Sequence, residues 1–77
     1  MEEKIITLRQ PLDFAGTPVA EIRLREPVAR ELEEAGGSTV ALISAIAKLP
    51  KSLIGNMAAR DYLEASRYLN GFLLESP

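Results

Sequence analysis

Apolar and polar residues alternate along two segments near the N-terminus. The apolar positions are Ile6 and Leu8 in residues 4–9, KIITLR, and Ala20, Ile22 and Leu24 in residues 19–25, VAEIRLR. A period of two residues is typical of a half-buried β-strand. The intervening QPLDFAGTP contains two prolines and a glycine. We therefore expect an antiparallel hairpin closed by a loop that is longer than a tight turn.

Helical spacing begins after this hairpin. Pro27 suits the first position of a helix, and Val28, Leu32 and Ala35 follow at helical intervals. The pair Gly36-Gly37 is expected to end this helix, because glycine tolerates the left-handed conformation beyond a helix C-terminus. Ser38 is a suitable N-cap for a second helix.

The rest of the chain predicts two or three further helices. The second helix covers residues 38–49, and Pro50 ends it and opens a short third helix within residues 50–57. Asn56 is expected to cap the last helix, where Asp61 lies early enough to interact favourably with the helix dipole. The predicted fold is α+β, a single domain over residues 1–77 with an N-terminal antiparallel β-hairpin followed by three or four α-helices.

The last helix has more apolar surface than one side of a core requires. In RDYLEASRYLNGFLL, residues 60–74, the apolar arc covers about 240° of the helix. Either this surface completes the core or it binds another protein. The binding interpretation assigns partner contacts to the apolar positions of this helix: Tyr62, Leu63, Tyr68, Leu69, Phe72, Leu73 and Leu74.

Chain length favours the binding interpretation. The 77 residues are 47% hydrophobic and 26% charged, as in a folded globular protein, but they allow only one core. Two helices that are apolar around most of their circumference are hard to enclose within it. We therefore expect some of this surface to remain exposed and to take a partner helix or a second copy of the chain.

Charge and composition argue against other functions. The net charge of −2 gives no overall attraction for nucleic acid, and the chain has neither cysteine nor histidine. We expect no enzyme activity, no cofactor and no metal site. The charged N-terminus does not resemble a secretory signal, and no apolar run reaches the roughly 20 residues that span a bilayer. These features predict a protein of the cytoplasm that has no membrane partner.

One alternative comes from arginines of the predicted strands. Arg9, Arg23 and Arg25 could share a sheet face and contact a nucleic-acid backbone. This would make the chain a small nucleic-acid-binding protein or transcriptional regulator. Glu21 lies among them and no aromatic residues cluster nearby, so a solvated or salt-bridged face is the simpler interpretation.

Two stretches, ITLRQPLDFAGTPVAEIRLREP and LPKSLIGNMAARDYLEASRYLNGFL, contain a series of motif positions that together span nearly the whole chain. These positions are Leu8, Pro11, Gly16, Leu24, Arg25, Pro27, Asp61, Tyr62, Phe72 and Leu73. Their order resembles that of the phage tail assembly chaperones of Mu-like and related contractile-tailed phages.

This resemblance implies a non-catalytic role in a phage or prophage. Such a chaperone binds the hydrophobic, helical tape-measure protein in the host cytoplasm and keeps it soluble until the tail tube polymerises. The family also implies, as a further partner, a longer form of the same product made by ribosomal frameshifting. A structural tail component that is retained in the virion is the remaining alternative.

Overall fold

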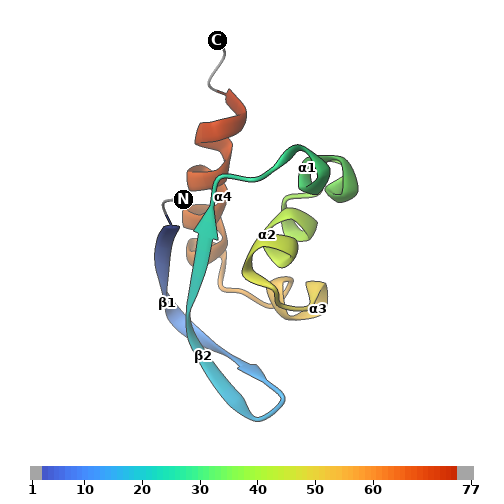
Figure 1. The fold of residues 1–77 in the computed structure, drawn as a ribbon. Helices are drawn as coiled ribbons and strands as arrows, with labels where there is room; N and C mark the ends of the chain where they lie inside the picture. Colours follow the sequence, from blue (N-terminus) through green and yellow to red (C-terminus); the bar gives the residue numbers. More distant parts are fainter. Residues whose placement is uncertain (1–2, 75–77) are drawn as a thin grey trace.

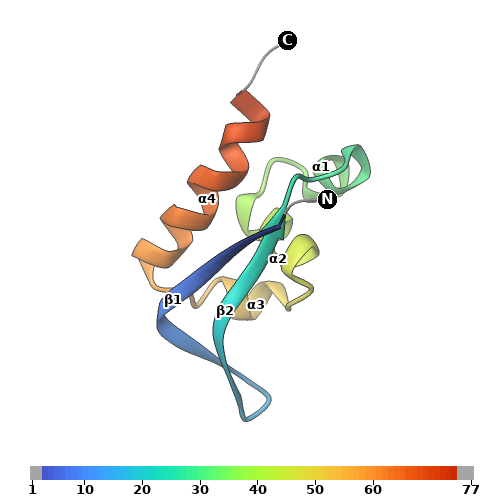
Figure 2. The same ribbon diagram turned by 60° about the vertical axis from the view of Figure 1, so that its left-hand side comes forward.

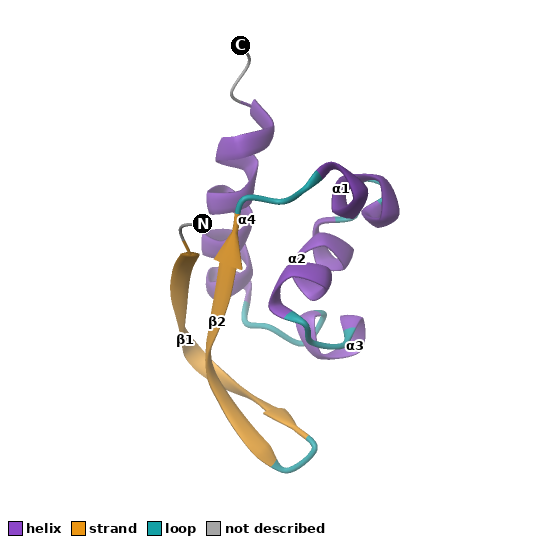
Figure 3. Cartoon of the chain, viewed as in Figure 1, coloured by secondary structure: helices purple, strands orange, loops and turns teal. Residues whose placement is uncertain are grey.

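The computed structural model describes the backbone of residues 3–74 and the side chains of residues 3–72. The elements in chain order are β1 (Glu3–Phe14), β2 (Thr17–Arg25), α1 (Ala29–Ala35), α2 (Thr39–Ala47), α3 (Lys51–Ile54) and α4 (Ala59–Leu74). Figures 1 and 3 show the hairpin on one side of the four helices. The predicted α+β fold is confirmed. Within the described residues, no helix combines the length and hydropathy needed to cross a bilayer.

The hairpin is longer than predicted, and its loop is shorter. The antiparallel pairing runs from Glu3 opposite Arg25 to Phe14 opposite Thr17, so the turn contains only two residues. The predicted long loop is therefore wrong. In a two-stranded sheet both strands are edges, so Pro11 and Pro18 can remain within strands without breaking a central ladder.

The two turn residues both have positive φ. Ala15 has φ +54° and Gly16 has φ +85°, the combination found in the tight turns that match the twist of a hairpin. Glycine adopts this backbone without strain, whereas alanine does so only at a cost in energy. The alanine explains why the turn was not evident from the sequence.

The hairpin register shifts in its middle. Between the pairs Thr7–Glu21 and Leu12–Val19, β1 contains four residues and β2 only one. The carboxylate of Asp61 fills this irregular region: Oδ1 accepts the backbone N–H of Arg9 at 3.0 Å, and Oδ2 accepts that of Gln10 at 3.2 Å. The first turn of α4 is thereby joined to β1, and Asp61 is 1% exposed.

The core lies between one face of the hairpin and the helices. Neighbouring side chains alternate, so that Ile6 and Ile22 are buried while Ile5 and Arg23 face solvent. α4 packs on β1 and α2 on β2, as the rotated view in Figure 2 shows. The largest fully buried apolar side chains come from both strands, α2, α3 and α4: Ile6, Leu24, Ile43, Ile54 and Leu69.

The helix ends match the predictions in part. Gly36 adopts the left-handed conformation after α1, and the Oγ of Ser38 accepts the N–H of Ala41 at 3.1 Å, so both predicted caps are confirmed. Pro27 is not the first residue of α1, because its buried ring precedes the N-cap, Val28. Asn56 does not cap α4: the helix begins three residues later, and Asn56 lies in the turn after α3.

Candidate functional site

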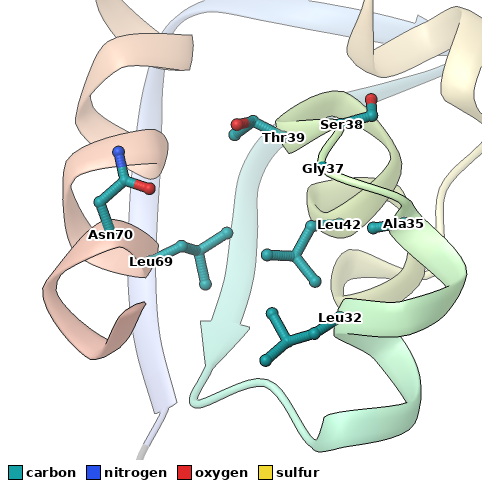
Figure 4. A pocket seen from close by; sticks show the side chains of 8 residues that line it. All are labelled: Leu32, Ala35, Gly37, Ser38, Thr39, Leu42, Leu69 and Asn70. Atoms are coloured by element: carbon teal, nitrogen blue, oxygen red, sulfur yellow. The ribbon is translucent and has the colours of Figure 1, made fainter. Parts of the chain in front are cut away.

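An apolar groove lies between α1 and α4, with α2 as its floor. Figure 4 shows Leu32 of α1, Leu42 of α2 and Leu69 of α4 pointing into it from three helices. The cavity volume is about 70 Å³. Its complete lining is Leu32, Ala35, Gly37, Ser38, Thr39, Leu42, Leu69 and Asn70. We call this site the α1–α4 groove.

The groove stays open because α1 is short and packs mainly on α2. None of the seven residues of α1 is buried. Leu32 remains 37% exposed at the rim, and Val28, one turn earlier, is 42% exposed. In contrast, Leu42 and Leu69 are 4% and 0% exposed. The base of the groove, at Leu42 and Leu69, is therefore shielded from solvent, whereas Leu32 on its α1 side is partly exposed.

A two-pronged ion pair fixes the start of α1. The guanidinium of Arg25 donates to both carboxylate oxygens of Glu31, at 2.9 and 2.7 Å. Glu31 also accepts the backbone N–H of Val28 at 3.0 Å, which satisfies a donor at the helix N-terminus. The hydrogen bonds from Arg25 and then from Val28 lower the pKa of Glu31 from its ordinary 4.5 to about 2.

Few polar groups reach the groove, and two are already engaged. The hydroxyl of Ser38 caps α2, and the side-chain amide of Asn70 donates to the Oγ of Ser66 at 3.4 Å. Nowhere in residues 3–74 do three histidine, cysteine, aspartate or glutamate side chains gather into a metal site. The arrangement is suited to binding an apolar side chain.

The structure separates the predicted partner-binding residues of α4. Leu69 is fully buried and forms part of the groove floor. Tyr62 and Tyr68 are half-buried and pack against the core. The rings of Tyr68 and Phe72 meet edge to face with centroids 5.2 Å apart. These apolar residues therefore contribute to packing within the domain itself.

Of the predicted residues with described side chains, Leu63 is the most exposed, at 47%. It lies six residues before Leu69, which places it about 120° away around the helix and outside the groove. The side chains of Leu73 and Leu74 lie outside the described part of the structure. The predicted set therefore does not form one continuous surface within the described residues.

Sequence reasoning did not identify Val28 and Leu32 as surface residues. Their spacing was used only to predict the helix, and the apolar surface expected to bind a partner was assigned to the last helix. The signal that could have identified them is the shortness of the helix between Pro27 and Gly36, because two turns provide little contact area for burying an apolar face.

Comparison with known proteins identifies one family. Residues 5–74 match the family model described as "Phage tail assembly chaperone proteins, E, or 41 or 14". The matched region contains β1 from its third residue onwards, all of β2 and the four helices, and every residue that lines the α1–α4 groove. No match was found among the curated proteins or among the solved structures.

Proposed function

The chain belongs to the family of phage tail assembly chaperone proteins, and from this membership we propose that it binds the hydrophobic, helical tape-measure protein and keeps it soluble during tail assembly. The proposed role is non-catalytic and takes place in the host cytoplasm. It requires a surface that can hold an apolar helix reversibly. The α1–α4 groove is our candidate for that surface.

The observation that carries this proposal is the half-exposed Leu32 opposite the buried Leu69. An apolar side chain of a partner helix could enter between them and rest on Leu42. Leu73 and Leu74, assigned to the partner contact from the sequence, remain part of the proposal. Tyr62, Tyr68 and Phe72 would support this surface from within α4.

The expected strength of binding suits a chaperone. If a partner buries about 500 Å² of apolar surface on this chain, the gross gain is near 12 kcal/mol at about 25 cal/mol per Å². Association and side-chain ordering consume much of this gain. The remainder corresponds to a reversible complex that can release the partner when the tail tube forms.

Co-expression with the tape-measure protein of the same phage tests the proposal. We expect the soluble yield of the tape-measure protein to rise, and the two proteins to co-purify. The matched control is co-expression with the Leu32→Glu variant, which places a charge at the rim of the groove. An unchanged soluble yield with the wild-type chain would contradict the chaperone role.

Two alternatives differ in what they predict for purified particles and for nucleic acid. A structural tail component would remain in virions in fixed copy number, whereas a chaperone would be absent from them. A nucleic-acid-binding regulator would bind DNA or RNA in a strongly salt-dependent manner. Self-association and a complex with a frameshifted longer form are further proposals, and size measurements on the co-purified material test both.

A further inference from the structure

A second surface lies on the outer side of α4, where it meets β1. Arg60, Leu63, Glu64 and Arg67 follow one another at helical spacing, and Arg9 of β1 adjoins them. Together these five residues line a hollow of about 350 Å³. We call this surface the arginine patch.

The arginines of this patch are not ion-paired with any described carboxylate. The ion pair between Arg25 and Glu31 is the only one among the described residues, so Arg9, Arg60 and Arg67 form none with residues 3–72. The nearby carboxylate of Asp61 is buried and engaged by two backbone N–H groups. Three arginines against one glutamate give a positive surface on a chain whose net charge is −2.

The centre of the patch is apolar. Leu63 is 47% exposed among the charged side chains, as at the anchor point of a protein interface. Guanidinium groups form two-pronged hydrogen bonds with carboxylates, and the geometry of these bonds requires the carboxylate to be well positioned. An apolar contact at Leu63 would position the partner's carboxylates relative to the arginines.

We propose that the arginine patch binds an acidic amphipathic helix of a partner protein. An apolar side chain of the partner would pack on Leu63, and its glutamates or aspartates would pair with Arg60, Arg67 and Arg9. A nucleic acid fits this surface less well, because Glu64 would repel phosphates and the patch has no aromatic side chain on which bases could stack.

This site is distinct from the α1–α4 groove. Leu63 and Leu69 point in directions about 120° apart around α4, one to solvent and the other to the core. The groove selects apolar character alone, whereas the patch selects negative charge together with an apolar anchor. The inference therefore goes beyond the proposed function, and either surface can be disabled without the other.

A synthetic peptide tests the proposal directly. The probe is a fluorescein-labelled amphipathic helix with leucines on one face and glutamates on the other, titrated with the full chain. We expect saturable binding that weakens as salt is raised. Amide NMR shifts should change at Arg9, Arg60, Leu63 and Arg67, and remain unchanged at Leu32, Leu42 and Asn70.

Charge reversal provides the decisive comparison. Arg60→Glu combined with Arg67→Glu should weaken peptide binding by about tenfold or more, because two favourable charge contacts become repulsive. Arg23→Glu combined with Lys51→Glu makes the same change in net charge at exposed positions of β2 and α3 and should leave binding almost unchanged. Circular dichroism of both variants checks that the fold is retained.

Other outcomes would overturn the inference. Equal binding of the peptide by the two double variants would show that net charge alone is responsible. If a peptide with lysines in place of its glutamates bound the wild-type chain equally well, charge complementarity would play no part in binding. Displacement of the peptide by a single-stranded oligonucleotide at equal concentration would favour nucleic acid. Loss of self-association in the Arg60→Glu, Arg67→Glu variant without any peptide binding would assign the patch to a second copy of the chain.

Discussion

The carboxylate of Asp61 lies 3.0 Å from the backbone nitrogen of Arg9, 52 residues earlier in the chain. Its second oxygen accepts the N–H of Gln10, and the next residue, Pro11, has no N–H to donate. The donors released where the hairpin register shifts are therefore satisfied by the first turn of α4. One side chain thus joins the irregular part of β1 to the helix that carries both candidate binding surfaces.

Asp61→Ala is expected to lower the free energy of unfolding by about 2 kcal/mol, because it removes the acceptor of two part-buried backbone N–H groups. Urea unfolding at neutral pH measures this change. Asp13→Ala is the matched control, since Asp13 is an exposed aspartate of β1, the strand whose N–H groups Asp61 accepts. Equal stability of the two variants would contradict the structural role of Asp61.

The ion pair between Arg25 and Glu31 predicts a pH dependence. Since the pKa of Glu31 is about 2 in the folded protein and near 4.5 ordinarily, its contribution is complete above about pH 5 and is lost as pH falls towards 2. Glu31→Gln should lower stability by about 1 kcal/mol at pH 7. The difference from wild type should shrink below pH 5.

Urea unfolding at pH 7, 5 and 3 measures this difference. Glu33→Gln serves as the control on the exposed side of α1 and should show no comparable loss at pH 7. A gap between Glu31→Gln and wild type that widens as pH falls would have the wrong sign for a carboxylate whose pKa is lowered by folding.

Leu32→Glu is expected to reduce capture of the tape-measure protein and change the free energy of unfolding by less than about 1 kcal/mol, because the side chain is already 37% exposed. Pull-down from the co-expressed pair measures capture. Ile5→Glu is the matched control: Ile5 is 48% exposed on the outer face of β1, away from the groove. Equal loss of capture in both variants would place the contact elsewhere.

The tight turn of the hairpin can be improved. Ala15 has φ +54° at a position where asparagine is preferred, so Ala15→Asn should stabilise the protein by about 0.5 to 1 kcal/mol. Thermal unfolding followed by circular dichroism measures the change. Ala20→Asn, an exposed alanine within β2, should be neutral or destabilising, because asparagine is unfavourable in strands. A destabilising Ala15→Asn would contradict the turn geometry.

Local sequence patterns predicted most of the strands and helices but not how these elements pack against one another. The alternation around Ile6 and Ile22 identified both strands, and Gly36 and Ser38 marked helix ends as local chemistry requires. The turn at Ala15 was missed because alanine gives no sign of positive φ. Asp61 was correctly placed in the first turn of its helix, but its contact with β1 depends on tertiary packing, which no local pattern contains.

The candidate surfaces were harder to predict than the fold. The wide apolar arc of α4 was assigned to partner binding, and the structure places part of that arc in or against the core: Leu69 is fully buried, and Tyr62 and Tyr68 pack against the core. The exposed wall of the groove comes instead from α1. The arginine patch joins residues that are about fifty positions apart, Arg9 and Arg60, so only the fold brings them together.

The absence of buried residues in α1 has a consequence for its dynamics. A helix without a buried residue can separate from α2 without disturbing the packing of α2 on β2. Its amide hydrogens should therefore exchange with deuterium through a local opening, well before those of α2. Helix α1 would then be the least stable part of the groove. The width of the groove that a partner side chain encounters would depend on how often α1 separates from α2.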